Sequence, residues 1–406
     1  MRRAPLQGGW FLGGAIVLAL VGCGGPRGTP DAADLVPPGA SSFLRVRTSQ
    51  VPRAVVLLAR FPLSSSLPRG GLLRHVPRVP PGAGPELDVA TIGGGRVFYT
   101  QPVDEQAFAK QLEVAGSLHA RIRGWTVFTA SATLLDAVRA RRGSLTDRPW
   151  FEAASATLPS EAALREVVPG WRATGLTVQD GGAELEVHRL QPSLPLPQVG
   201  SSLAAEVPAD AIAAVGVAGP QNVPRRAPKL LHELASALGG PVVGWVRAGT
   251  PLPEVTVVSR PADSRRALGA IARLIARLTK NPASGAVTLG GRPMRRVANG
   301  AIDIYYGLLG GELVVTDSAT APGRLASASG AGGRTLAALS RLPDLTESWA
   351  YANVREGLPL AKLFEGLFDT QVPTALETRL APLRDVLVYA SHDARVATIV
   401  TRIDIR

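Results

Sequence analysis

Two kinds of hydrophobic pattern run along the chain. Spacings of three and four residues between apolar positions predict amphipathic helices near 55–61 and at 104–115, 230–238 and 264–280. Alternation of apolar and polar residues predicts strands, because successive side chains of a strand point to opposite faces. Such alternating segments lie at 43–47, 86–92, 124–131, 212–217, 254–259 and 311–318.

Short glycine turns join many of these segments. They occur at Gly93–Gly95, Gly290–Gly291 and Gly310–Gly311, where tight turns connect antiparallel neighbours. Alternating strands leave one face for packing and one face exposed or covered by helices. The sequence therefore predicts an α+β fold, with a mainly antiparallel sheet and helices packed on one face.

The same order of patterns occurs twice. Val36-Pro37-Pro38-Gly39-Ala40 leads into an alternating strand and an apolar helix, and Val207-Pro208-Ala209-Asp210-Ala211 does the same. The strand 86–92 and the helix after it are matched by the strand 254–259 and its helix. Hairpins close both halves, at 176–190 and 386–403. An internal duplication is the interpretation, with two tandem related α+β units at 35–190 and 207–406.

A proline-rich segment separates the two units. Prolines at 192, 195 and 197 exclude both a regular helix and pairing in the middle of a sheet. Residues 191–206 are therefore predicted to be a linker.

The N-terminus carries an export signal. Arg2 and Arg3 precede an apolar run, Trp10 to Leu20, that is too short to span a membrane. The run ends at Leu20-Val21-Gly22-Cys23, which contains the single cysteine of the chain. This motif resembles the lipobox of bacterial lipoproteins.

The resemblance implies that the thiol of Cys23 receives a diacylglyceryl group and that cleavage then makes Cys23 the new N-terminus. Residues 1–22 would be a lipoprotein signal peptide, and 23–34, rich in Gly, Pro, Ala and Asp, a flexible tether. The alternative is an ordinary secretory leader or an N-terminal anchor helix with an incidental cysteine.

A lipobox places the protein in the bacterial cell envelope, lipid-anchored, with its body outside the cytoplasm. Gly24 follows the cysteine where an aspartate would favour retention in the inner membrane. The outer membrane, on its periplasmic or surface face, is therefore preferred.

A second resemblance rests on the repeated Val-Pro-x-x-Ala phrase and the strand and leucine-rich helix that follow it. The arrangement is similar to an uncharacterised family of bacterial envelope proteins catalogued only as a domain of unknown function. This resemblance implies the architecture and carries no activity or catalytic residues to this chain.

The chain is basic, with a formal net charge of +12. The excess is almost entirely arginine, since lysine occurs only at positions 110, 229, 280 and 362. The arginines are scattered and lack interleaved stacking aromatics, so we expect no nucleic-acid partner. They either keep the protein soluble or favour contact with anionic lipid headgroups.

Motifs for catalysis and metal binding are missing from the sequence. Its five histidines, at 75, 119, 188, 232 and 392, lack the spacing of a zinc site, so no metal or other cofactor is expected. The phosphate-loop motif and the nucleophile motifs of known hydrolases do not occur either, and the glycine clusters at 93–95 and 323–333 are interpreted as flexible loops. Two carboxylate pairs remain candidates for hydrolysis of an envelope polymer, Glu184 with Glu186 and Asp303 with Glu312.

One helix suggests a ligand or a surface. Residues 264–280 set a leucine- and isoleucine-rich side against Arg265, Arg266, Arg273 and Arg277. This helix could lie at a lipid surface, cover an acyl chain or pack on its own sheet. A cluster of aromatics in the first unit could line a pocket or fill a core: Phe98, Tyr99, Trp125, Phe128, Trp150 and Phe151.

These observations predict a non-catalytic, membrane-anchored lipoprotein with a binding or scaffolding role. One version binds an apolar envelope molecule such as a lipid between the two units. The alternatives are an enzyme that acts on envelope polymers through the candidate carboxylates, and a factor that assembles with another envelope protein.

Overall fold

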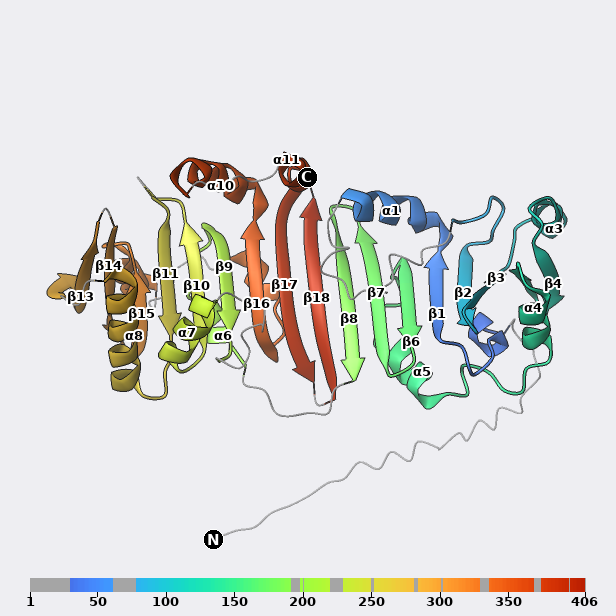
Figure 1. Cartoon of the computed structure of the whole chain (residues 1–406), viewed down its shortest axis with the longest axis horizontal. Helices are drawn as coiled ribbons and strands as arrows, with labels where there is room; N and C mark the ends of the chain where they lie inside the picture. The colour runs from blue at the N-terminus through green and yellow to red at the C-terminus, as the bar shows by residue number, and fades with distance from the viewer. Residues whose placement is uncertain are drawn as a thin grey trace, which may run out of the picture.

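One antiparallel sheet of 18 strands forms the framework of the protein, seen here in a computed structural model (Figure 1). The structure describes residues 30–60, 78–190, 198–199, 201–219, 229–249, 252–280, 284–300, 302–328, 336–368, 374–393 and 395–405. The predicted signal peptide, the lipobox and Cys23 lie outside these residues.

The strands divide between two halves of the chain. Those of the first half are β1 (Ser42–Arg47), β2 (Glu86–Ile92), β3 (Gly95–Thr100), β4 (Leu118–Ile122), β5 (Trp125–Thr129), β6 (Leu164–Val168), β7 (Arg172–Gln179) and β8 (Gly182–Leu190). Those of the second half are β9 (Ala211–Val217), β10 (Val242–Arg247), β11 (Glu254–Ser259), β12 (Gly285–Leu289), β13 (Arg292–Asn299), β14 (Ile302–Leu309), β15 (Glu312–Thr316), β16 (Thr346–Asn353), β17 (Leu383–Asp393) and β18 (Val396–Ile405).

The two halves meet where β8 pairs with β18, with Val187 opposite Ile399. Outward from this seam the first half follows the order β8-β7-β6-β1-β2-β3-β5-β4. The second half follows β18-β17-β16-β9-β10-β11-β15-β14 and then adds β13 and β12. The protein is therefore an α+β protein with one long sheet.

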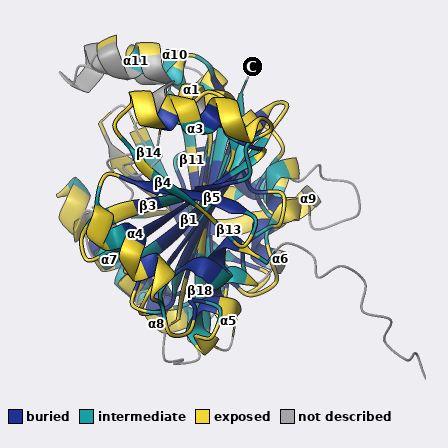
Figure 2. Cartoon of the chain, turned by 90° about the vertical axis from the view of Figure 1, so that its right-hand side faces the viewer, coloured by how far each residue is buried: buried dark blue, intermediate teal, exposed yellow. Residues whose placement is uncertain are grey.

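Helices lie on both faces of this sheet. The α-helices are α1 (Val51–Arg60), α3 (Glu105–Val114), α4 (Ala132–Arg139), α5 (Pro149–Ser155), α6 (Ser201–Ala204), α7 (Lys229–Leu238), α8 (Ser264–Thr279), α9 (Ala321–Ala328), α10 (Val354–Phe368) and α11 (Thr374–Leu380). Short 3-10 helices include η1 (Ala32–Leu35), η2 (Thr48–Gln50) and η5 (Ala337–Arg341). Viewed along the sheet, buried strands lie at the centre and helices surround them (Figure 2).

The prediction that helices pack on one face is wrong. Val242 packs with α7 and α8, whereas its neighbour Val243 packs on the other face with α6 and η5. In the first half, α1 and α3 cover one face and α4 and α5 the other. Every residue of β5 is buried for the same reason. Strands buried on both faces are apolar at successive positions, and such runs do not alternate.

Several predicted elements are confirmed. The helix at 264–280 is α8, and Asp263 caps it by accepting a hydrogen bond from the backbone N–H of Arg266 at 2.9 Å. The helix at 230–238 is α7, followed by Gly239 with a φ of +68°. The hairpins at 176–190 and 386–403 are β7–β8 and β17–β18. His392 belongs to β17.

Two predicted boundaries need correction. The flexible tether was expected to extend to residue 34, but Ala32 and Ala33 are buried in the core of the first half. Small side chains fit close to the sheet there, and Asp31 accepts a hydrogen bond from Ala33 N–H at 2.8 Å. The linker was expected to extend to residue 206, but Val199 and Leu203 are buried in the core of the second half.

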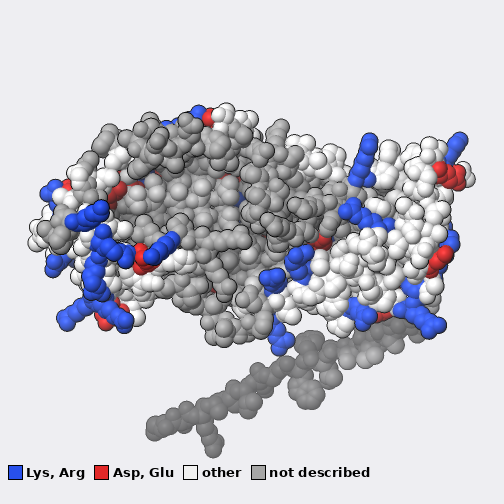
Figure 3. Space-filling model, in the orientation of Figure 1, with Lys and Arg blue, Asp and Glu red and all other residues white. Residues whose placement is uncertain are grey.

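The charged groups are spread over the molecule, as the sequence suggests. On the face shown in Figure 3, Lys and Arg side chains lie at several separate places, with one gathering over the α8 end of the sheet.

Candidate functional site

An apolar cavity in the second half is the candidate site considered first. It lies where α6 and η5 cover β16, and its volume is about 350 Å³. Volumes of roughly 300 to 1,000 Å³ are typical of small-molecule sites. The cavity is lined by Val199, Ala204, Ala205, Leu336, Ala337, Leu339, Ser340, Leu342, Pro343, Asp344, Thr346 and Trp349.

Backbone hydrogen bonds hold the covering segments over the sheet. The N–H of Val199 donates to the carbonyl of Thr346 at 2.9 Å, and the N–H of Leu336 donates to the carbonyl of Val207 at 3.2 Å. Leu203 and Leu339 then point into the core cluster and are buried. The walls of the cavity are therefore fixed by the chain's own hydrogen bonds.

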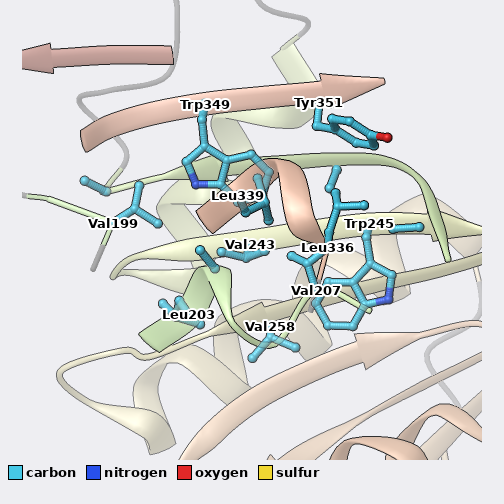
Figure 4. Packing of buried hydrophobic residues seen from close by; sticks show 14 of the residues in the cluster. Val199, Leu203, Val207, Val243, Trp245, Val258, Leu336, Leu339, Trp349 and Tyr351 are labelled. Atoms are coloured by element: carbon cyan, nitrogen blue, oxygen red, sulfur yellow. The ribbon is translucent and has the colours of Figure 1, made fainter. Parts of the chain in front are cut away.

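Trp349 on β16 forms part of the cavity's inner wall, beside the buried Thr346. Trp349 is 3% exposed and packs over Gly216 of β9, which lies opposite it in the sheet. A Cβ atom at position 216 would lie 2.3 Å from the indole Nε1 of Trp349, so only glycine fits. In Figure 4 the indole nitrogen lies on the side of the ring turned toward Val199.

The indole N–H of Trp349 is buried and has no hydrogen-bond partner among the described residues. A buried donor left without a partner costs roughly 1 to 3 kcal/mol, so native proteins usually satisfy such groups. Exposed Ser340 and Asp344 lie at the cavity's outer side. The apolar walls suit an apolar molecule, and the buried indole N–H beside Gly216 is a donor without a partner among the described residues.

Each candidate carboxylate lies against a basic side chain of the protein. Glu184 forms an ion pair with Arg402 across the seam, and the Glu186 carboxylate lies 2.9 Å from Nε2 of His188. Asp303 pairs with Arg296 at 2.8 Å, and Glu312 with Arg260 at 2.6 Å. Glu184 and Glu186 share one strand face, as expected.

The histidines are separated in the structure. His119 lies on β4, His188 on β8, His232 on α7 and His392 on β17, while His75 lies outside the described residues. Within the described part of the chain, His, Cys, Asp and Glu side chains form no group of three that could hold a metal ion. Nδ1 of His188 lies 3.1 Å from the Thr398 hydroxyl, which joins it to the opposite strand.

The amphipathic helix and the aromatic cluster belong to the core. In α8, Ile271, Leu274 and Ile275 pack against the sheet. The aromatics of the first half divide between the two faces, since Tyr99 and Trp125 lie in one cluster and Phe128 in the other. They fill the protein interior, and Phe151 also lines a small pocket beside Phe43 and Arg45.

An ion-pair cluster fixes the first described residues to the sheet. Arg45 on β1 contacts Asp31 and the fully buried Asp88 of β2, the latter at 3.2 Å. Burial alone would lower the pKa of Arg45, but the charge of Asp88 and the hydrogen bond to Asp31 raise it. The indole N–H of Trp125 also donates to the carbonyl of Pro30 at 2.8 Å. The chain therefore enters the fold at a defined place.

Comparisons with known proteins give little further information. No family model matches the chain, and no curated protein matches it significantly. A solved structure titled "Structure of crystal form I of TP0453" shows 11% sequence identity and a TM-score of 0.21, over 75% of this chain and 98% of that one. None of the described helices is both long enough and apolar enough to cross a membrane.

Sequence reasoning missed Trp349 and its cavity. One signal was present, because Gly216 interrupts an apolar strand, and such a glycine often marks a close approach of another group. The group that approaches it comes from a strand far along the chain and could not be read from the sequence.

Proposed function

We propose that this protein is a lipid-anchored envelope lipoprotein that binds, without catalysis, an apolar molecule carrying a hydrogen-bond acceptor. The observation that carries the proposal is the apolar cavity beside the buried indole N–H of Trp349, which has no hydrogen-bond partner in the described part of the chain. A carbonyl or ester oxygen of a lipid would satisfy that donor, while its hydrocarbon part would fill the apolar walls. Each candidate carboxylate already lies against an arginine or histidine side chain of the protein, so we base no second function on them.

We also propose that the two halves are tandem related units that arose by duplication. The same strand order on both sides of the β8–β18 seam supports this proposal. By position in the sheet, β11 corresponds to β3, whereas the sequence patterns had matched it with the strand at 86–92. The hairpin β12–β13 would then be an addition to the second unit.

The proposed anchor is an acylated Cys23, supported by the lipobox sequence. Asp31, held by Arg45, lies only a few residues beyond it. An acyl anchor would keep the cavity close to the membrane from which an apolar ligand is taken, because each buried methylene contributes roughly 0.8 kcal/mol to membrane binding. The outer membrane remains the preferred location.

The first test is native mass spectrometry of the protein purified from its host membranes. A stoichiometric apolar ligand is expected. The ligand-free protein would then be titrated with the dye N-phenyl-1-naphthylamine. Ala205→Trp, which fills the cavity from its exposed side, should weaken dye binding about tenfold or more. Ala209→Trp, an exposed site outside the cavity, is the matched control.

A second variant tests the role of the indole N–H. Trp349→Phe keeps an aromatic ring and removes the donor, so the affinity for methyl laurate should fall about three- to tenfold while that for dodecane is kept. Displacement of the dye measures both affinities. Equal binding of the dye by wild type and Ala205→Trp would refute the cavity as the site. If Trp349→Phe lost affinity for methyl laurate and dodecane equally, the proposed hydrogen bond from the indole N–H to the ligand would be refuted.

A further inference from the structure

A basic surface covers the outer side of α7 and α8, remote from the apolar cavity. We call it the α7–α8 basic surface, and its members are Lys229, Arg265, Arg266, Arg273, Arg277 and Lys280. All six residues are exposed. It corresponds to the gathering of Lys and Arg over α8 in Figure 3.

A recess between the two helices lies within this surface. Its volume is about 460 Å³, and Ala237, Ala270 and Leu274 give it an apolar floor. The cations Lys229, Arg273 and Arg277 also line it, together with the single carboxylate of Glu233. The recess therefore combines positive charge at its edge with apolar groups at its base.

The internal ion pairs leave most of this charge unbalanced. Glu233 contacts Arg277 directly and lies 4.0 Å from Lys229. Among the described residues, Arg265, Arg266 and Arg273 have no carboxylate partner. An external anionic partner would supply the missing negative charge.

The geometry of α8 decides how such a partner is bound. Ala267, Ile271 and Ile275 are buried against the sheet, so the apolar side of the helix is not free to enter a bilayer. Its arginine side faces solvent, and of its large apolar side chains only Leu278, near the C-terminal end, is exposed. The basic surface must therefore contact its partner from outside, without insertion of α8 into the partner.

We propose that the α7–α8 basic surface docks onto anionic phospholipid headgroups, with a headgroup phosphate at the cations of the recess. Charge complementarity favours this partner, because each basic side chain near an anionic bilayer contributes about fivefold to affinity. Apart from His232, the described residues lining the recess include no aromatic side chain on which a nucleic-acid base could stack. This contact is independent of the apolar cavity, and it would orient the body of an anchored protein.

The test uses the chain from Gly24 onward, which contains every described residue and lacks the anchor. Its co-sedimentation with phosphatidylcholine vesicles is compared with that on vesicles containing one-third phosphatidylglycerol. Binding should require phosphatidylglycerol and weaken as salt is added, because salt screens exposed charges. The triple variant Arg265→Glu, Arg266→Glu, Arg273→Glu should lose about tenfold or more in affinity.

The matched control makes the same charge change elsewhere. Arg96→Glu, Arg142→Glu and Arg189→Glu replace three exposed arginines of the first half, and together they should change vesicle affinity less than about threefold. An equal loss in the control would show an effect of net charge alone and overturn the proposal. Unchanged vesicle binding by the α8 triple variant would also overturn the proposal. Tighter binding of the wild type to duplex DNA than to the anionic vesicles would overturn it as well.

Discussion

At the scale of single residues, Gly216 and Trp349 define the candidate site together. Gly216 allows the indole of Trp349 to lie flat against β9, and the indole in turn forms the inner wall of the cavity. Neither residue is informative alone. A glycine in a strand and a buried tryptophan are both common. Only their contact creates a cavity wall whose indole N–H lacks a partner among the residues that the structure describes.

Gly216→Ala should destabilise the protein by about 1 to 3 kcal/mol, because the new methyl group would lie within 2.3 Å of the Trp349 ring and force it to move. Urea denaturation measures the free energy of unfolding. Gly285→Ala in β12 is the control, since a Cβ atom there meets no atom within 4 Å. Similar costs for both substitutions would contradict the tight packing of Trp349.

At the scale of elements, the hairpin β17–β18 places two carboxylates opposite each other. Asp385 and Asp404 are partners in the register of the two strands. Burial raises the pKa of Asp385, and the charge of Asp404 raises it further, while Arg384 and Arg341 oppose these effects. The pKa of Tyr351 on the neighbouring strand is raised to about 12 by burial and by the charge of Asp385.

Asp385→Asn should therefore stabilise the protein at neutral pH. The folded state binds the Asp385 proton more tightly than the unfolded state, so the wild type loses stability as pH rises from about 4 through the raised pKa. Asp385→Asn lacks this loss. Its free energy of unfolding should exceed that of the wild type by up to about 1 kcal/mol near pH 7, because directly opposed like charges destabilise strand pairs.

Denaturation by urea at pH 4 and pH 7 measures this difference. Asp136→Asn on the exposed side of α4 controls for the loss of one carboxylate. An advantage of the Asp385 variant that is the same at both pH values would show that the titration of Asp385 is not its cause.

At the scale of the whole molecule, the sheet joins both halves through a single strand pair. The buried residues of the four large core clusters lie within one half or the other. The seam carries the β8–β18 ladder, the pair Glu184–Arg402 and a small apolar cluster in which Leu383 and Ile403 pack with Val178 and Ala183. The cavity and the α7–α8 basic surface both lie in the second half. The first half holds the start of the described chain.

The anchor is also a property of the whole molecule. Intact-mass measurement of the protein from its own membranes should show Cys23 at the N-terminus with a diacylglyceryl group attached. Cys23→Ser should abolish this modification and the cleavage before residue 23. A wild-type protein with a free Cys23 thiol would contradict the lipobox interpretation, while leaving the cavity and the basic surface open to their own tests.

The sequence by itself determined the local structure. Asp263 and Gly239 mark helix ends because a cap depends on neighbouring residues only. Glycine pairs mark hairpin turns because the positive φ values of Gly290 and Gly291 are local requirements. The α+β class follows from the same short-range patterns.

Only the tertiary structure decided how these elements combine. The sequence predicted helices on one face, but burial of β5 and β10 on both faces depends on which helices return to each side of the sheet. The cavity likewise depends on contacts between residues far apart in the chain, such as Val199 with Thr346 and Gly216 with Trp349. Hydrophobic periodicity reports only the strand or turn to which a residue belongs. It does not show which distant residue that residue contacts, so pairing of this kind leaves no signal in a single sequence.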